Sequence, residues 1–326
     1  MHIHIQEFAD SPYLKLTAPE FHEAAGLAGE IGAGHTLTVG ETAAEFAAAS
    51  PGIEALIATP AAIRRLDLTL APRLRLIQST SAGVDPLAPF DMIPSGVMLL
   101  NNRGVHADRA GEFAIMAMLM LATHMPAFAT DQRAHRWQRR ASGTVAGMRA
   151  TIVGVGGLGG GAARRARQFG IHVTGVRNGT APHPDCDATR PIADLDLILP
   201  NTDFLLLACP LTAATRNLLD ARRLTLLPPH AGVINMGRGA LADQPALCAA
   251  LRAGSIAGAV LDVFATEPVP PDDPVWDTPN LIMTPHISSD DPARYNAATL
   301  ASFFASLRAL AAGRVPATLV DFAQGY

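Results

Sequence analysis

The sequence has few cysteines, and their arrangement excludes several kinds of site. The three cysteines, Cys186, Cys209 and Cys248, lie far apart, and none belongs to a C-x-x-C pair or to a cysteine–histidine spacing typical of bound metal. We therefore predict no metal site. Because the cysteine count is odd and no signal peptide is recognised, we expect a reducing compartment and a cytoplasmic protein.

Long apolar runs and an excess of positive charge are also absent. The longest apolar run, residues 113–123, is shorter than the ~20 residues that span a bilayer and indicates a buried helix instead. The formal net charge is −4, and Lys15 is the only lysine. Since no basic surface is indicated, we predict neither nucleic acid nor a membrane as a partner.

The sequence is rich, by contrast, in alternating strand and helix patterns. Its 326 residues, of which 49% are hydrophobic, are enough for two globular domains. In the first hundred residues short apolar runs alternate with helical stretches, which indicates a parallel sheet covered by helices. The expected strands cover residues 2–6, 36–39, 53–58, 74–78 and 97–100, and the expected helices cover residues 18–28, 43–49 and 61–66.

A second series of the same kind begins near residue 150. Between the two series, residues 104–129 contain almost no turn-forming residues and predict one long buried helix that bridges two domains. A last helix is expected over residues 293–312. The strands expected in the second series cover residues 150–155, 171–176, 204–209, 232–236, 258–263 and 281–284, with helices over residues 158–169 and 245–251.

These patterns predict an α/β fold with two doubly wound domains, the second inserted into the first. We expect a flavodoxin-like substrate domain formed by residues 1–102 and 290–326, and a Rossmann NAD(P)-binding domain formed by residues 103–289. The expectation that the last helix returns to the first domain rests partly on a family resemblance, which the motifs described next carry.

A glycine-rich turn follows the first strand of the second series. The run V-G-V-G-G-L-G-G at residues 153–160 has the G-x-G-x-x-G spacing between an expected strand and an expected helix. Its glycines permit a tight turn, the approach of a pyrophosphate and close packing of the helix on the strand. An ordinary glycine-rich turn is the alternative. We predict that the dinucleotide binds at Gly154, Gly156, Gly157, Leu158 and Gly159.

An arginine ends the next expected strand, where an acid commonly binds the adenosine ribose of NAD. Arg177 lies eighteen residues after Gly159, and Asn178 and Thr180 add polar groups. An acid would repel a 2′-phosphate, whereas the planar guanidinium of arginine suits one. We therefore predict that NADPH is preferred over NADH. The alternative is that Arg177 projects into solvent and both cofactors are used.

Three later segments place charged residues directly after or at the end of expected strands, where ligands bind in open α/β sheets. Arg238 lies between two glycines and can hold a small carboxylate through paired hydrogen bonds. Glu267 and His286 suit proton transfer, because a carboxylate beside an imidazole raises the pKa of the imidazole. Asp262 lies in an apolar strand and needs a polar partner. Each residue alone has a structural explanation, but the set predicts catalytic roles for Arg238, Glu267 and His286.

The motifs together resemble the D-isomer-specific 2-hydroxyacid dehydrogenase family, close to its glyoxylate/hydroxypyruvate reductase branch. The resemblance covers most of the chain from about Leu74 onward. It rests on the blocks S-A-G-V-D, G-V-H-A-D-R-A-G-E-F, V-G-V-G-G-L-G, A-C-P-L-T-A-A-T-R-N-L-L, N-M-G-R-G-A-L-A-D, L-D-V-F-A-T-E-P and T-P-H-I-S.

The resemblance implies a homodimeric enzyme that reduces a small 2-keto acid to the D-2-hydroxy acid with NAD(P)H. Arg238 would bind the substrate, His286 would be the acid/base that also contacts it, and Glu267 would be the partner of His286. Asp262 would hold the nicotinamide carboxamide. The remaining implied contacts are the backbone of Ala82, Gly83 and Val84 to the substrate, and Cys209, Pro210, Thr215, Met236, Gly237 and Ser289 to the cofactor.

Two residues near the start of the long expected helix depart from the family pattern. Arg109 stands where many members have a small residue. It is either a second substrate anchor or, as we expect, it pairs with Asp108 or Glu112 at the surface. Gly111 replaces the more usual alanine, and the sequence offers no explanation for it.

The same fold also allows two other functions. A phosphoglycerate-type dehydrogenase fits less well, because residues 59–62 offer no basic group for a substrate phosphate. A dinucleotide-sensing, corepressor-like binding protein would be expected to carry disordered partner-binding tails. Which 2-keto acid is used is not predicted, since Phe90, Trp137 and Trp276 either line the pocket or simply pack.

Overall fold

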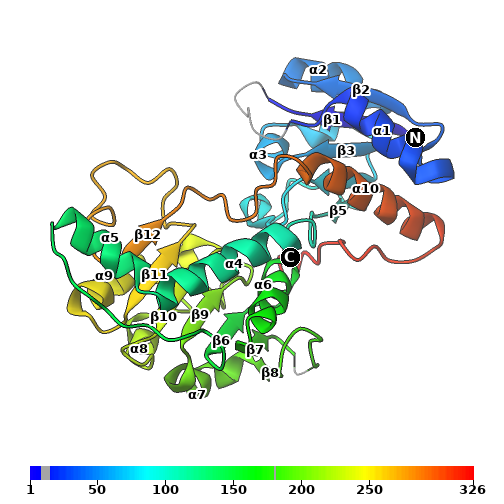
Figure 1. Cartoon of the computed structure of the whole chain (residues 1–326). Helices are drawn as coiled ribbons and strands as arrows, with labels where there is room; N and C mark the ends of the chain where they lie inside the picture. Colours follow the sequence, from blue (N-terminus) through cyan, green and yellow to red (C-terminus); the bar gives the residue numbers. More distant parts are fainter. Residues whose placement is uncertain (9–14, 180) are drawn as a thin grey trace. The chain divides into compact units, whose positions relative to one another are not determined.

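The chain folds into two compact α/β units, each with its own parallel sheet (Figure 1). The computed structural model describes residues 1–8, 15–179 and 181–326. Unit 1 comprises Met1–Val105 and Asp291–Tyr326, and unit 2 comprises His106–Asp290.

Unit 1 is built on a five-stranded sheet with the strand order β2-β1-β3-β4-β5. All of its strand pairs are parallel, and the order is that of the flavodoxin-like fold, which confirms the predicted fold class. The strands are β1 (His2–Gln6), β2 (Thr36–Gly40), β3 (Ala55–Ala58), β4 (Leu76–Ser79) and β5 (Met98–Leu100), and the helices are α1 (Ala18–Ala28), α2 (Ala43–Ala49), α3 (Pro60–Ile63) and α10 (Tyr295–Ala311).

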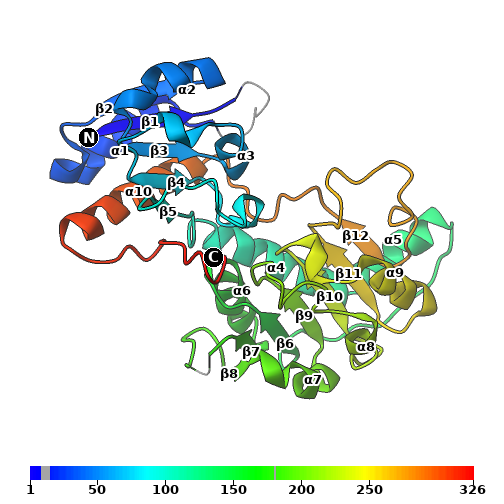
Figure 2. The same cartoon turned by 180° about the vertical axis from the view of Figure 1, so that it is seen from behind.

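The C-terminal helix α10 returns to unit 1 and packs beside α1 (Figures 1 and 2). Phe303 and Phe304 of α10 share a buried cluster with Phe21 of α1, and the ring centroids of Phe21 and Phe304 are 5.5 Å apart. Asn296 of α10 also donates a hydrogen bond of 2.9 Å to Glu20. The last helix therefore lies in the same unit as the N-terminal sheet.

Unit 2 contains a seven-stranded parallel sheet with the order β12-β11-β10-β9-β6-β7-β8. The chain starts at β6, builds outward to β8, and then returns to the other side of β6 with β9. This is the Rossmann arrangement, in which ligands bind at the carboxyl ends of the strands beside the switch point. The strands are β6 (Arg149–Val153), β7 (His172–Arg177), β8 (Ala188–Pro191), β9 (Phe204–Leu207), β10 (Gly232–Asn235), β11 (Gly258–Leu261) and β12 (Leu281–Met283), and the helices are α4 (Ala107–Ala122), α5 (Met125–Arg133), α6 (Gly157–Gln168), α7 (Leu195–Ile198), α8 (Ala221–Leu224) and α9 (Gln244–Ala253).

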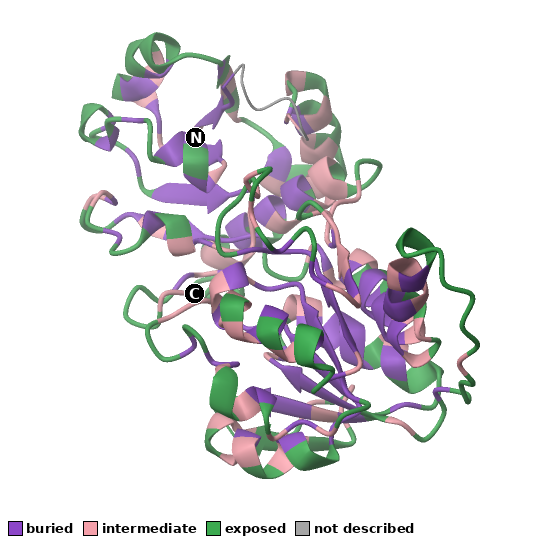
Figure 3. Cartoon of the chain, turned by 90° about the vertical axis from the view of Figure 1, so that its left-hand side faces the viewer, coloured by how far each residue is buried: buried purple, intermediate pink, exposed green. Residues whose placement is uncertain are grey.

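Helices cover both faces of this sheet. The side chains of the apolar strand β9 pack against helices on each face. Phe204 and Leu206 pack in a cluster with residues of α4 and α6, whereas Leu205 and Leu207 pack on the other face with residues of α7 and α9. Figure 3 shows the strands buried between helices whose outer surfaces are exposed. Continuous apolar strands are typical of parallel sheets covered on both sides.

Two glycines let α4 and α6 approach closely on one face. A Cβ atom added at Gly161 would lie 1.9 Å from the carbonyl oxygen of Ala107, and one added at Gly111 would lie 2.6 Å from the carbonyl oxygen of Gly161. Neither distance leaves room for a methyl group. Gly111, which the sequence alone does not explain, is thus required by the contact of α4 with the helix after the glycine-rich turn.

The expectation of one long helix over residues 104–129 is wrong. α4 ends at Ala122, and α5 begins at Met125 after His124, which has a φ of 58°. A continuous helix would press the ring of Pro126 against the carbonyl group four residues earlier, and proline has no N–H to donate. Among the described residues no single helix has the length and composition to cross a membrane; only α4 and α5 together meet those criteria, and they are bent by 64°.

Three short elements of unit 2 escape prediction from the sequence. β8 is an edge strand of partly exposed residues with little apolar content, and α7 and α8 have four residues each. Such segments lack the apolar periodicity on which prediction depends. In unit 1, α3 is shorter than expected and ends at Ile63 rather than at residue 66.

Candidate active site

The residues predicted in unit 2 lie along one edge of its sheet, because each occupies or follows the carboxyl end of a strand. In sheet order, β12 is followed by His286, β11 by Asp262, β10 by Arg238, β9 by Cys209 and β6 by Gly154, and β7 ends at Arg177. The strands that carry the catalytic candidates are thus at one side of the edge. The glycine-rich turn and Arg177 are at the other.

The three glycines of the turn after β6 meet different requirements. Gly154 has a φ of 90°, and a Cβ atom added there would lie 2.5 Å from Cα of Cys209. Gly159 packs on the turn itself, since its added Cβ would lie 1.9 Å from the carbonyl oxygen of Gly154. At Gly156, by contrast, an added Cβ would have no described atom within 4 Å. The space beside the second glycine is therefore open, as a phosphate site requires.

The N-terminus of α6 begins at this open space. Gly157 and Leu158 form its first residues, and no side chain of the described part of the chain caps it. Its first N–H groups can therefore donate hydrogen bonds to an anionic ligand. The helix dipole also favours a negative charge at this end. The predicted pyrophosphate site has the geometry that such a group needs.

Arg177 is the last residue of β7 and lies opposite Pro191 of the edge strand β8. Its side chain is exposed, and its guanidinium makes no hydrogen bond or ion pair with any residue that the structure describes. Asn178 follows it and is also exposed, while Thr180 lies outside the described residues. The guanidinium is therefore accessible to an anion at this end of the edge.

The predicted cofactor residues Cys209, Pro210 and Thr215 form a turn after β9. The hydroxyl of Thr215 donates to the carbonyl oxygen of Pro210 at 2.7 Å, and it accepts from the amide of Thr212 at 2.8 Å. Burial raises the pKa of the Cys209 thiol to about 12, which disfavours the reactive thiolate form. A Cβ added at Gly237 would lie 3.2 Å from the carbonyl oxygen of Cys209, which shows that the turns after β9 and β10 adjoin.

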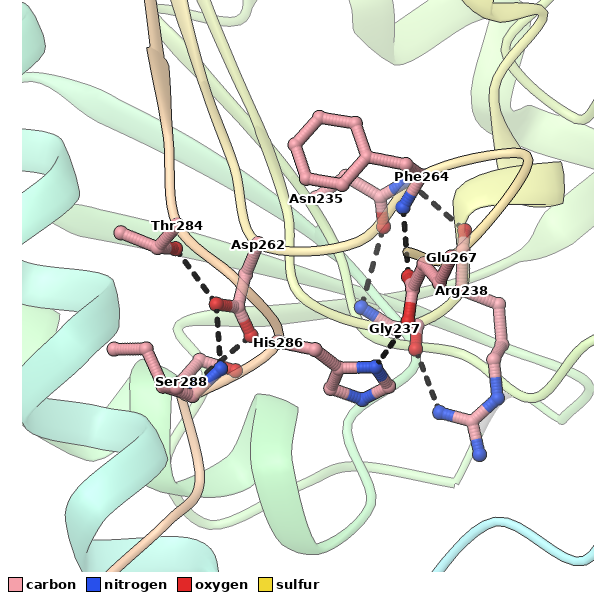
Figure 4. A network of polar contacts seen from close by, with 10 residues as sticks. Asn235, Gly237, Arg238, Asp262, Phe264, Glu267, Thr284, His286 and Ser288 are labelled. Atoms are coloured by element: carbon pink, nitrogen blue, oxygen red, sulfur yellow. Dashed lines mark hydrogen bonds and ion pairs between the residues drawn. The ribbon is translucent and has the colours of Figure 1, made fainter. Parts of the chain in front are cut away.

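Asp262 follows β11 and is completely buried. Its Oδ1 accepts hydrogen bonds from the hydroxyl of Thr284 at 2.6 Å and from the amide of Ile287 at 2.8 Å, and its Oδ2 accepts one from the amide of Ser288 at 2.9 Å (Figure 4). The polar partners that a buried carboxylate needs are present, as expected. They all belong to the segment that carries His286.

His286 and Glu267 form a close pair (Figure 4). Nδ1 of His286 lies 2.7 Å from Oε2 of Glu267, and Oε1 of Glu267 accepts a hydrogen bond of 2.8 Å from the amide of Phe264. The hydrogen bond that His286 donates to Glu267 raises the pKa of His286, although burial opposes it. Burial acts to raise the pKa of Glu267, but the hydrogen bonds from His286 and Phe264 outweigh it and lower that pKa. The pair therefore favours an imidazolium beside a carboxylate.

The backbone fixes the direction of the His286 ring. His286 has a φ of 55°, and its amide is 2.9 Å from the carbonyl oxygen of Asp262 and 3.0 Å from that of Thr284. Nδ1 faces Glu267. The other ring nitrogen, Nε2, has no hydrogen-bond partner among the described residues. Nε2 is thus the atom that can exchange a proton with a ligand.

Arg238 lies in the turn after β10. Its Nη1 donates a hydrogen bond of 2.8 Å to the carbonyl oxygen of Gly237, and its charge acts to lower the pKa of His286. Figure 4 shows the guanidinium and the imidazole ring on the same side of the polar network. Met236, a predicted cofactor residue, is buried in the core cluster beneath α4 and α6.

Asn235, the last residue of β10, is absent from the site residues predicted from the sequence. Its side chain, 1% exposed, accepts a hydrogen bond from the amide of Gly237 at 3.2 Å and donates one to the carbonyl oxygen of Arg238 at 2.9 Å. An amide side chain at the end of an apolar strand, three residues before a predicted substrate-binding arginine, is the signal that identifies it.

The expectation that Arg109 pairs with Asp108 or Glu112 is wrong. Both acids form ion pairs with arginines of α6, which the close contact of α4 and α6 brings within reach. Nε of Arg109 instead donates to the carbonyl oxygen of Asp290 at 3.3 Å. Nearby, Nδ1 of His106 lies 3.2 Å from the carbonyl oxygen of Ser289, the last predicted cofactor residue. The start of α4 thus holds the backbone that follows the His286 segment.

The predicted substrate contacts of residues 82–84 belong to unit 1, in the loop after β4. The hydroxyl of Ser79 accepts a hydrogen bond of 3.2 Å from the amide of Ser81 directly before this loop. Val84 is 2% exposed, whereas Ala82 and Gly83 are partly exposed. Their role in substrate binding stays a prediction.

The three aromatic candidates have different surroundings. Phe90 is buried in unit 1 and stacks on Phe322, with ring centroids 5.0 Å apart. Trp276 donates from its indole nitrogen to the carbonyl oxygen of Pro270 at 2.8 Å. Trp137 alone is almost fully exposed, at 98%.

Comparison with known proteins finds relatives in both sequence and structure. The family model described as "D-isomer specific 2-hydroxyacid dehydrogenase, NAD binding domain" matches residues 115–288. The chain is 32% identical over 256 residues to glyoxylate/hydroxypyruvate reductase B of Pectobacterium carotovorum, a match that covers 76% of this chain and 80% of that protein.

Two solved structures are similar to nearly the full length of the chain. The NADPH-dependent glyoxylate/hydroxypyruvate reductase of Sinorhizobium meliloti, in complex with NADP and sulfate, has a TM-score of 0.80 and 26% identity over 100% of both chains. A D-isomer specific 2-hydroxyacid dehydrogenase of Xanthobacter autotrophicus, in complex with NADPH and MES, has a TM-score of 0.82 and 26% identity over 99% of both chains.

Replacement of Glu267 by glutamine tests the electrostatics of the pair. E267Q keeps the shape of the side chain but removes the negative charge that stabilises the imidazolium, so we expect the pKa of His286 to fall. NMR titration of the imidazole nitrogens measures it. His230, which pairs with Asp203 at 2.8 Å at the opposite ends of the strands, is the internal control, and its imidazole signals should not change in the variant. An unchanged pKa of His286 would show that Glu267 does not set it.

Proposed function

This chain belongs to the D-isomer specific 2-hydroxyacid dehydrogenase family, and we propose that it reduces a small 2-keto acid to the D-2-hydroxy acid with a nicotinamide cofactor. The names of its relatives point to glyoxylate and hydroxypyruvate as substrates. The reaction consumes NAD(P)H and one proton, and it forms NAD(P)⁺ and the hydroxy acid. The protein must therefore supply a proton donor and a site for a carboxylate.

The observation that carries this proposal is the His286–Glu267 pair beside Arg238, on the sheet edge that also carries the glycine-rich turn. A histidine whose pKa is raised by a carboxylate can donate a proton near neutral pH. An arginine beside it suits a carboxylate ligand. We assign unit 2 as the dinucleotide-binding domain and unit 1, with residues 82–84, as the domain that adds substrate contacts.

In the proposed mechanism His286 is the general acid. Its Nε2 donates a proton to the carbonyl oxygen of the substrate, while Glu267 stabilises the imidazolium through Nδ1. Arg238 binds the carboxylate of the substrate and stabilises the negative charge that develops on the carbonyl oxygen. When bound, the dihydronicotinamide supplies the hydride for the carbonyl carbon. In the oxidative direction, neutral His286 accepts the proton of the hydroxyl group.

The residues at the other side of the edge fit a dinucleotide that carries a 2′-phosphate, and we propose that NADPH is preferred. Beside Gly156 the backbone is open, and the uncapped start of α6 faces the same space. Arg177 supplies an exposed guanidinium at the end of β7. The complexes of the S. meliloti and X. autotrophicus proteins with NADP or NADPH support this preference. By the family resemblance, Cys209, Pro210, Thr215, Gly237 and Ser289 would line the rest of the cofactor.

We also propose that the protein is a homodimer and that Trp137 contributes to the interface. The segment after α5 is anchored by Asp131, whose side chain is only 4% exposed and which pairs with Arg136 at 2.8 Å and with Arg140. This anchored segment presents Trp137 almost fully exposed. Tryptophan is enriched at the centres of protein interfaces because it buries a large area.

Loss of the proton donor gives the direct test of the activity. H286A should lower kcat for glyoxylate and hydroxypyruvate by ~10²–10⁴, the usual effect of removing a positioned acid. The measurement is the oxidation of NADPH followed by absorbance. H230A is the matched control, because His230 forms a similar acid pair far from the sheet edge. Near-normal turnover by H286A would refute the role of His286, and an inactive wild type would refute the activity.

The cofactor preference is tested at Arg177. R177D removes the guanidinium and adds a charge that repels a 2′-phosphate, so the ratio of kcat/KM for NADPH to that for NADH should fall at least about tenfold. R222S, which changes an exposed arginine of α8, should leave the ratio unchanged. A wild type that prefers NADH, or an unchanged ratio in R177D, would contradict the proposal.

The dimer is tested by light scattering. The wild type should have about twice the chain mass of 34.1 kDa, and W137E should shift the population toward the monomer, because a buried charge opposes association. A wild type with the monomer mass would contradict the proposal. A W137E dimer as stable as the wild type would place the interface elsewhere.

A further inference from the structure

We infer that Asn235 is a positioning residue that sets the orientation of the Arg238 guanidinium toward the substrate carboxylate. The inference rests on the proposed function, which assigns the carboxylate to Arg238. Asn235 ends β10 and is 1% exposed, so its side-chain amide has access to almost no water. Both ends of that amide are instead bound to the turn that carries Arg238.

The contacts of Asn235 reach Arg238 from two directions. Its Nδ2 donates to the carbonyl oxygen of Arg238 at 2.9 Å, which fixes the main chain of the arginine. Its Oδ1 accepts from the amide of Gly237 at 3.2 Å. The carbonyl group of the same Gly237 then accepts the hydrogen bond from Nη1 of Arg238 at 2.8 Å (Figure 4). The side chain of Asn235 thus orients the backbone of Arg238. It also orients Gly237, whose carbonyl group accepts the hydrogen bond from the guanidinium.

Asparagine is the residue type that these contacts require. The turn presents an N–H donor and a C=O acceptor to one buried side chain, and an amide offers an acceptor and a donor together. Aspartate has the same shape but no donor for the carbonyl group of Arg238. Its negative charge would also attract the guanidinium that the proposed function reserves for the substrate. Alanine would leave both buried backbone groups without their partner.

The same strand ends also fix His286, but through other atoms. The backbone carbonyl of Asn235 accepts a hydrogen bond of 2.9 Å from the amide of Asp262, whose carboxylate holds the His286 segment. Among the described residues, the side chain of Asn235 makes no hydrogen bond with His286 or Glu267. Changes to that side chain should therefore disturb Arg238 and leave the imidazole–carboxylate pair in place.

The test compares N235A and N235D with T202A as a matched control. Thr202 is completely buried and donates at 3.1 Å to the carbonyl oxygen of Ile198 before β9, far from the carboxyl edge, so T202A removes a buried polar group without touching the site. For each variant we would measure kcat and KM for glyoxylate, KM for NADPH and the melting temperature. Calorimetry would give the Kd of oxamate, a carboxylate that is not reduced, on enzyme saturated with NADP⁺.

Positioning predicts a specific change in substrate binding. KM for glyoxylate and Kd for oxamate should rise about tenfold or more in N235A, and further in N235D, because an oriented charge-assisted hydrogen bond is lost. KM for NADPH should stay within about twofold of the wild type. The NMR pKa of His286 should also stay unchanged in N235A.

Three other outcomes are informative. If N235A and N235D only lower the melting temperature, as T202A does, with unchanged KM and oxamate Kd, Asn235 is merely structural and the inference is overturned. If the wild type binds oxamate but does not reduce 2-keto acids, the proposed function fails, and weaker oxamate binding in N235D still supports the inference. If the wild type neither binds oxamate nor turns over, both are refuted.

Discussion

A single buried carboxylate is the constraint on which the site depends. Asp262 has no exposed surface, so its charge must be compensated inside the protein. Three donors from residues 284–288 compensate it, and losing them would leave a buried charge without partners, which costs ~3–5 kcal/mol. Because His286 lies inside this segment, its position follows from the needs of a charge on the neighbouring strand. Glu267 then has only to complete an arrangement that the backbone has already fixed.

The rest of the site uses the order of strands in the sheet. Parallel strands that are buried on both faces can expose polar groups only at their ends, and the carboxyl ends meet at one edge. Arg238 and His286 are set at one side of this edge by Asn235 and Asp262, whereas Gly156 and Arg177 are set at the other. The proposed proton donor and the proposed phosphate-binding turn thus lie at opposite sides of one sheet edge.

The sequence predicts those features that have a strong local pattern. The apolar strands, the glycine spacing and the pair of Glu267 with His286 belong to this class, and the structure brings that pair to 2.7 Å. What depends on tertiary contacts escapes prediction. The sequence places Asn235 at the end of an apolar strand, but its role follows only from its two hydrogen bonds to the next turn. Arg109 likewise finds its partner in a segment far along the chain. Gly111 is explained only by the helix that crosses it.

The central claim is that His286, held protonated by Glu267, supplies the proton in 2-keto acid reduction. The most direct test measures kcat/KM for glyoxylate against pH, at saturating NADPH, together with the NMR pKa of His286 in the same complex. A group whose pKa is raised stays protonated up to that pKa, so the rate should be constant below it and fall as the pH rises through it. The account predicts that the midpoint of the fall equals the pKa of His286. A rate that stays constant while His286 loses its proton would contradict it.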